Sequence, residues 1–227
     1  MNGSAYAGKS KIQMTLGKDL LTLVQNKTVI DFGCGEGLES FDLAHHGAQR
    51  VIGIDIRKSV LEKASKNAIA AGLSDRCEFV TSTNTKAEII VSLDSFEHFE
   101  DPAAVLEVMY DLLKPGGLAI ISFGPTWYHP LGGHLFSVFP WAHLLFSEQA
   151  LIRWRAHLRD DGAKRFSEVE GGLNQMTIAR FVRLVSASRF RMQTLETVPI
   201  RKLAPVHCKL TREFTTAVVR AKLARSG

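Results

Sequence analysis

The first half of the chain alternates short β-rich runs with helical runs, and this order restricts the chain to few folds. Strands that alternate with helices form parallel β-α-β units, whose crossovers are right-handed. The pattern therefore predicts an α/β fold, a doubly wound parallel sheet with helices on both faces. The expected strands are 28–32, 50–55, 77–80, 89–91 and 118–123, and the expected helices are 38–46, 59–71 and 101–113.

The second half interrupts this rhythm with residues 124–165, which are rich in aromatic residues, His and Pro. Long connections in compact α/β domains usually carry function. Order returns in helices expected at 148–158 and 177–188 and strands at 190–198 and 214–219. We predict a single domain over 1–227, with a helix over 11–24, whose segments are an N-terminal lid (1–26), a ligand-binding core (27–123), an insertion (124–165) and the C-terminal part of the sheet (166–227).

The charge of the chain is concentrated at its C-terminal end. The net charge is +5, and residues 201–227 hold seven basic residues and one acidic residue. We interpret this segment as a solvated strand and tail. Contact with RNA, an anionic substrate or a membrane surface is the alternative.

Composition excludes several other classes of protein. Hydrophobic residues make up 45% and charged residues 22%, as in ordered globular domains. No apolar run approaches the roughly 20 residues that span a bilayer, and no secretory signal opens the sequence. Cys34, Cys77 and Cys208 lie far apart, so we expect neither a disulfide framework nor a metal site. These features predict a cytoplasmic protein.

The stretch Val29–Gly37 is the most informative motif. A buried strand runs into Gly33, Gly35 and Gly37, and a helix follows. In a dinucleotide fingerprint the third glycine would stand at Leu38. An acidic residue before the loop, Asp31, suits an ammonium and a sulfonium rather than a pyrophosphate. The motif therefore favours S-adenosylmethionine (SAM) over NAD, with a nicotinamide oxidoreductase left as an alternative.

Four segments together resemble the class I SAM-dependent methyltransferases, and most of all the branch that acts on small molecules and quinones: Val29–Gly37, Gly53–Asp55, Ile89–Asp101 and Leu112–Ser122. The resemblance implies a Rossmann-like sheet of seven strands with the last one antiparallel, and a lid insertion after strand 5. It also implies SAM as the cofactor and S-adenosylhomocysteine (SAH) as its product.

The resemblance further implies which residues hold SAM. Asp55 would bind the ribose hydroxyls and Ile56 would pack on the adenine. The acidic residue that the family often has after the third strand is missing here, so hydroxyls of Ser82 and Thr83 or backbone groups must recognise the adenine. The full predicted set is Asp31, Gly33, Cys34, Gly35, Gly37, Asp55, Ile56, Ser82, Thr83, Leu93 and Asp94.

Methyl transfer to an alcohol or phenol needs a group that accepts the proton, and histidine suits that task. We predict a small-molecule acceptor with a hydroxyl or carboxyl oxygen, and a quinol carbon as a close alternative. An RNA methyltransferase or a SAM-binding module without turnover remains possible from the residues alone, and the oligomeric state is not predicted. Candidate bases are His98, His129 and His134, and candidate acceptor-binding residues are Tyr6, Trp127, Tyr128, Phe136 and Trp141. Each of these side chains has a structural role as its alternative.

Overall fold

The computed structural model describes residues 12, 18–136, 139–157, 162, 164–168 and 172–226. The contacts group the chain into two compact units. Unit 1 consists of Met1–Leu93, Val108–Ser122 and Lys222–Gly227, and unit 2 consists of Asp94–Glu107 and Phe123–Ala221. The division into a lid, a core, an insertion and a C-terminal part stays a prediction.

Seven strands of the described residues form one mixed sheet, in the order β3-β2-β1-β4-β5-β7-β6, with the last strand antiparallel. This arrangement confirms the predicted α/β Rossmann-like fold. The strands are β1 (Thr28–Phe32), β2 (Arg50–Ile54), β3 (Cys77–Val80), β4 (Ala87–Leu93), β5 (Leu113–Phe123), β6 (Phe190–Pro199) and β7 (Thr216–Arg225).

The predicted helices are confirmed with ends shifted by at most two residues, apart from the N-terminal one. Of the predicted helix over 11–24, the structure describes α2 (Lys18–Leu23) and residue 12, and residues 11 and 13–17 lie outside the described part. No helix in the described ranges is long and apolar enough to cross a membrane. The other helices are α3 (Leu38–His45), α4 (Lys58–Ala70), α5 (Pro102–Leu112), α6 (Ala142–Leu145), α7 (Glu148–Ala156), α8 (Ile178–Ala187) and α9 (Arg212–Thr215), with short 3₁₀ turns η2 (Phe96–His98), η3 (His134–Phe136), η4 (Phe166–Glu168) and η5 (Arg201–Val206).

Three strands begin elsewhere than the sequence predicts. β4 starts at Ala87, two residues before the predicted start at residue 89. β5 starts at Leu113 instead of residue 118, because the fully buried Leu113 already pairs with Ala87 before the exposed turn that follows it. β7 starts at Thr216 because the residues before it form α9, and it continues to Arg225, six residues beyond the predicted end. Within α9, the Glu213 carboxylate accepts the backbone N–H groups of Ile178 and Ala179, the first two residues of α8.

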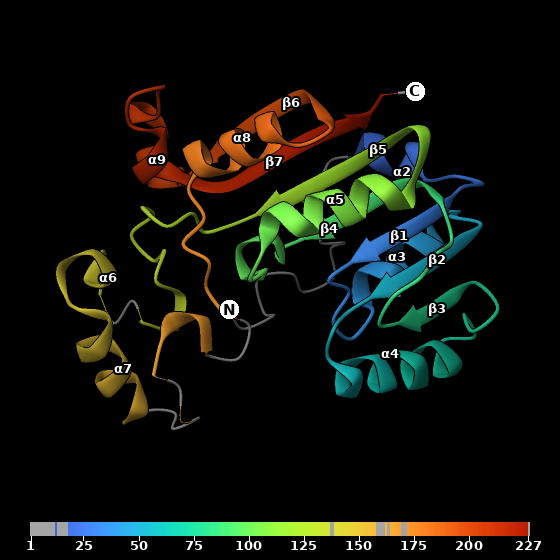
Figure 1. Ribbon diagram of the computed structural model, residues 1–227, viewed down its shortest axis with the longest axis horizontal. Coiled ribbons are helices and arrows are strands. Elements are labelled where there is room, and N and C mark those ends of the chain that lie inside the picture. The colour runs from blue at the N-terminus through green and yellow to red at the C-terminus, as the bar shows by residue number, and fades with distance from the viewer. Residues whose placement is uncertain are drawn as a thin grey trace. The chain divides into compact units, whose positions relative to one another are not determined.

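In unit 1, the parallel register brings the ends of neighbouring strands together. β1 pairs with β2 so that Phe32 lies opposite Ile54, and it pairs with β4 on its other side. Figure 1 shows β3, β2, β1 and β4 side by side, with α4 next to β3. The loop after β1 therefore begins beside Asp55, the residue that follows β2. Buried aliphatic side chains from these strands and from α3 and α4 form the core of the unit.

In unit 2, three fully buried phenylalanines form one ring cluster. Phe96 from η2 lies 5.3 Å from Phe181 of α8, measured between ring centroids, and Phe123 at the end of β5 lies 5.0 Å from the same ring. These separations suit edge-on and tilted aromatic packing. The cluster fixes η2, which also contains Glu97, against the rest of the unit.

We expect the change Phe181→Ala to lower the free energy of unfolding by about 3–5 kcal/mol, because it leaves a cavity among buried rings. Urea denaturation measures this loss. The matched control is Phe214→Ala, since the Phe214 side chain is 46% exposed and should cost less than about 1 kcal/mol. Equal losses in the two variants would show that the ring cluster does not carry the stability of unit 2.

Candidate functional site

The glycine-rich loop after β1 is tied to the end of β2. The backbone N–H groups of Gly33 and Cys34 both donate to the Ile54 carbonyl, at 2.8 and 3.0 Å, and the N–H of Gly37 donates to the Cys34 carbonyl at 3.0 Å. Gly33, Gly35 and Gly37 have φ angles of 84°, 53° and 84°. Glycine adopts this left-handed conformation without strain, which explains the alternate spacing of the motif.

Gly35 and Gly37 serve different purposes. A Cβ at Gly37 would lie 2.7 Å from the Phe79 ring, so this glycine is needed for packing within unit 1. A Cβ at Gly35 would meet nothing within 4 Å, so the backbone there borders open space. A ligand can therefore approach the main chain closely at Gly35.

The Asp55 carboxylate stands directly beside this loop. Its Oδ2 accepts the Gly35 N–H at 3.1 Å, and its Oδ1 accepts the Arg57 N–H at 2.9 Å. The Arg57 guanidinium donates to both oxygens. Burial alone would raise the pKa of Asp55, but the hydrogen bonds and the charge of Arg57 outweigh it, so the pKa lies below its usual value. Asp55 is therefore ionised at neutral pH.

Asp31 and Cys34 make the loop acidic without giving it a nucleophile. Asp31 is buried, and its Oδ2 accepts the Ser40 hydroxyl at 2.6 Å. Burial, with the nearby carboxylates of Asp31 and Asp55, raises the pKa of the Cys34 thiol far above its usual value. Cys34 thus stays a neutral thiol, and the charge that the loop offers to a ligand is negative.

The other residues predicted to contact the cofactor have mixed surroundings. The Ile56 side chain, next to Asp55, is 89% exposed, and Ser82 is exposed too. Thr83 Oγ1 accepts the N–H of Thr85 at 3.1 Å. Leu93 is buried at the end of β4, and Asp94, the first residue of unit 2, has a φ of 48°.

These features of unit 1 fit the parts of SAM. The acidic loop with open space at Gly35 suits a cationic ammonium and sulfonium, and a carboxylate is the group that pairs with two ribose hydroxyls. The exposed Ile56 offers an apolar surface to a planar base. The residues therefore fit the cofactor that the loop predicts.

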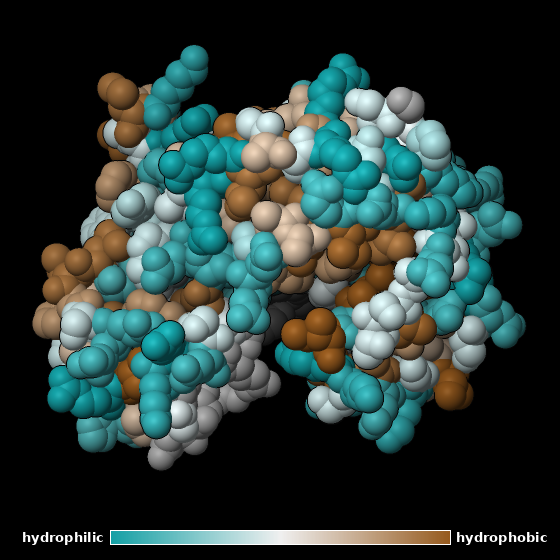
Figure 2. Space-filling model, viewed as in Figure 1, coloured by the Kyte–Doolittle hydropathy of each residue, from teal (hydrophilic) through white to brown (hydrophobic). Residues whose placement is uncertain are grey.

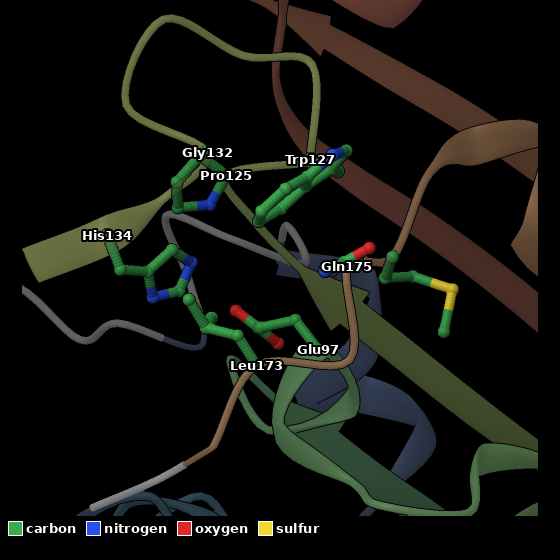
Figure 3. A pocket seen from close by; sticks show the side chains of 8 residues that line it. Glu97, Pro125, Trp127, Gly132, His134, Leu173 and Gln175 are labelled. Atoms are coloured by element: carbon green, nitrogen blue, oxygen red, sulfur yellow. The ribbon is translucent and has the colours of Figure 1, made fainter. Parts of the chain in front are cut away.

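Unit 2 contains a small cavity of about 10 Å³, which is close to the space that one water molecule needs. Figure 3 shows the side chains of Glu97 and His134 both turned toward it. Glu97 is 3% exposed, and its Oε1 accepts the Gly124 N–H at 3.2 Å. The full lining is Glu97, Pro125, Trp127, Gly132, His134, Leu173, Gln175 and Met176.

His134 has a buried ring nitrogen beside this cavity. Its ring pairs with the Pro125 carbonyl, and its Nε2 is buried with no hydrogen-bond partner among the described residues. The ring centroid of His98 lies 5.2 Å away, edge to face. Burial, followed by the nearby His98, lowers the pKa of His134 to about 4. The imidazole is therefore neutral at pH 7, with its lone pair on Nε2 if Nδ1 donates to Pro125.

The segment after residue 171 holds the η2 turn in place. The Asn174 side-chain amide donates to the carbonyls of Phe96 and Phe99, both at 2.9 Å, and its backbone N–H donates to the Glu97 carbonyl. His98 Nδ1 pairs with the Gly172 carbonyl at 2.7 Å. These bonds hold the η2 turn, and with it Glu97, against residues 172–174.

Sequence reasoning did not select Glu97, although it stands inside a motif used for the resemblance, next to His98. The sequence signal that could have identified it is an acidic residue directly before a candidate base, His98. Leu173, Asn174, Gln175 and Met176 carry no such signal, since they belong to an irregular segment between a 3₁₀ turn and α8.

The remaining predicted acceptor residues lie in three settings. Trp127 lines the cavity, whereas Phe136 packs in a buried cluster with Leu151 and Phe166. His129 Nδ1 accepts the Leu131 N–H at 2.9 Å, which gives this histidine a role in a turn. Tyr6 lies outside the described residues.

Tyr128 and Trp141 are exposed, and the Trp141 Nε1–H donates to the Tyr128 carbonyl at 3.0 Å. They belong to a stretch of unit 2 whose surface is apolar, which Figure 2 shows in the region of α6. Leu145 of α6 is 70% exposed.

Comparison with known proteins identifies the family. Residues 23–164 match the family described as Methyltransferase domain, so the chain belongs to it. This membership confirms the predicted family of SAM-dependent methyltransferases and its cofactor, SAM.

Curated relatives match over part of their length. The ubiquinone biosynthesis O-methyltransferase of Stutzerimonas stutzeri is 36% identical over 102 residues, which are 42% of this chain and 44% of that protein. The enzyme of the same name from Psychrobacter cryohalolentis is 33% identical over 104 residues, 42% of this chain and 40% of that protein. The chain thus spans less than half the length of these relatives. The structure of an S-adenosylmethionine dependent methyltransferase from Mesorhizobium loti has the same fold, with a TM-score of 0.59, 18% identity and coverage of 91% of this chain and 96% of that one.

The different roles of Gly35 and Gly37 predict different effects of an alanine substitution on stability and on SAH binding. Gly35→Ala should cost about 1–2 kcal/mol of unfolding free energy for the left-handed backbone, while weakening the binding of SAH because its methyl group enters the open space. Gly37→Ala should lose more stability, since its Cβ also meets the Phe79 ring. Urea denaturation and calorimetric titration with SAH measure the two effects. Equal stability losses would contradict the distinction.

The low pKa of His134 predicts a pH-dependent stability. In the unfolded chain a histidine titrates near pH 6.5, whereas the folded His134 titrates near pH 4. The unfolded state then binds more protons between these values, so unfolding becomes easier as pH falls from about 6.5 to 4. Urea denaturation at several pH values should show a smaller decline for His134→Gln than for wild type. Parallel declines would mean that His134 is not neutral in the folded protein.

Proposed function

We propose that this protein is a SAM-dependent methyltransferase that methylates a hydroxyl oxygen of a small acceptor, with His134 as the general base. The observation that carries the proposal is the cavity of unit 2, in which a neutral, buried His134 Nε2 and the Glu97 carboxyl group face the same space. The matched relatives are named as O-methyltransferases, which agrees with an oxygen acceptor.

The hydrogen-bonding character of the cavity selects the type of acceptor oxygen. The neutral His134 ring presents a lone pair on Nε2, which accepts a hydrogen bond and has no hydrogen to donate. A hydroxyl group supplies a hydrogen to such a site, whereas a carboxylate has only lone pairs to offer. This argument favours the hydroxyl over the carboxyl acceptor, which the sequence left open. Trp127 adds an aromatic wall to this cavity.

The residues of unit 1 provide for the cofactor. When bound, SAM supplies a methyl group on a positively charged sulfur, which is already a strong electrophile. Asp55 would hold the ribose hydroxyls, and the loop with Asp31 and Gly35 would hold the methionyl part. The protein therefore has no need to activate the methyl group and acts on the acceptor instead.

The role of His134 is to take the proton of the acceptor hydroxyl. The O–H bond breaks, the proton passes to Nε2, and the oxygen keeps the electron pair with which it attacks. General bases of this kind contribute about 10²–10⁴-fold in rate. His98, in edge-to-face contact with the His134 ring, helps to fix its orientation.

The proposal is tested with methyl-labelled SAM and pairs of small aromatic compounds that carry either a hydroxyl or a carboxyl group. We expect label in the hydroxyl compounds only. His134→Gln should lower kcat by about 100-fold or more, with the SAH dissociation constant unchanged within a factor of two. His157→Gln is the control, since His157 is an exposed residue at the end of α7.

Two results would overturn the proposal. If His134→Gln turns over at the wild-type rate, the base is another group. If label enters the carboxyl compounds alone, the hydrogen-bonding argument is wrong. A cytoplasmic location and a small molecule rather than RNA as the acceptor stay predictions from the sequence.

A further inference from the structure

We propose that the Arg57 side chain competes with the ribose of SAM for the Asp55 carboxylate, and so sets how tightly the protein holds its cofactor. This inference rests on the proposed function, since it assumes that Asp55 binds the ribose. It assigns a role to a residue that neither the motifs nor the family resemblance singles out.

The hydrogen bonds of Asp55 are fully used. Oδ1 accepts the Arg57 backbone N–H at 2.9 Å and the Arg57 Nε–H at 3.1 Å. Oδ2 accepts the Gly35 N–H at 3.1 Å and the Arg57 Nη2–H at 3.2 Å. A carboxylate has about four lone-pair positions. Four donors therefore occupy all of them, and two hydroxyls cannot be added to this arrangement.

Only the guanidinium can leave. The N–H groups of Gly35 and Arg57 belong to the main chain, and the Gly35 loop is fixed to the end of β2 by the hydrogen bonds of Gly33 and Cys34. The Arg57 side chain, in contrast, is about half exposed, with 46% of its surface open to water. Its two bonds end on different oxygens, one on each. Two ribose hydroxyls replace them one for one.

The strength of this competition is modest, because one partner is half exposed. Such ion pairs contribute about 0.2–1 kcal/mol, and salt weakens them further. Removing the guanidinium should therefore tighten cofactor binding by about 1.4- to fivefold. The direction of the change in affinity distinguishes the two possibilities, since removing a residue that helped to bind the cofactor would weaken binding.

The experiment is calorimetric titration of the full chain with SAH, whose net charge is close to zero at neutral pH. We expect Arg57→Ala to bind SAH about 1.4- to fivefold more tightly than wild type. Arg57→Lys, which keeps the charge but not the two-pronged geometry, should lie between them. The difference between Arg57→Ala and wild type should shrink as NaCl is raised from 20 mM to roughly 0.5 M.

Lys58→Ala is the matched control. It removes the same charge one residue further along, at an exposed position of α4 that makes none of the bonds to Asp55 described above. Its affinity for SAH should equal that of wild type. Equal tightening in Lys58→Ala would reduce the effect to net charge and overturn the inference.

A further variant separates this inference from the proposed function. Asp55→Asn should lose affinity for SAH if Asp55 binds the ribose. If it does, and Arg57→Ala binds SAH no better than wild type, the competition is refuted while the proposed function stands. If neither wild type nor Arg57→Ala binds SAH, or if Asp55→Asn binds as wild type does, the cofactor site itself is wrong.

Discussion

The parallel pairing of β1 with β2 is the constraint on which the cofactor half of the protein depends. Because Phe32 lies opposite Ile54, both strands end at the same level. The chain after β1 can then bond to the Ile54 carbonyl, and Asp55 meets the backbone of Gly35. A slip of the register by one residue would turn the side chains of β1 to the opposite face and separate the loop from Asp55.

Unit 2 builds its cavity by other means. The two polar side chains that face the cavity come from 3₁₀ turns and not from strand ends: Glu97 lies in η2 and His134 in η3. Hydrogen bonds from Asn174 and packing of Phe96 hold the first, and a left-handed backbone conformation places the second. Regular secondary structure thus positions the residues for the cofactor, while irregular segments position those proposed for the acceptor.

This contrast explains what the sequence could predict. The alternation of β-rich runs with helical runs predicted the ends of most strands and helices of unit 1 to within two residues. It thereby also predicted that the glycine loop and Asp55 lie side by side. It could not distinguish His129 from His134, since a turn hydrogen bond to Leu131 occupies one and a cavity surrounds the other. Nor could it show that a side chain only two residues from Asp55 satisfies that carboxylate, because local backbone geometry decides this.

The hydrogen-bond acceptors in the unit 2 cavity also bear on the end of the proposed reaction. A methyl ether no longer carries the hydrogen that the hydroxyl offered to His134 and Glu97. Once the protonated His134 has lost its proton to water, the product would place its ether oxygen against the lone pair of Nε2. Turnover itself would therefore weaken the hold on the molecule, which favours product release and works against product inhibition.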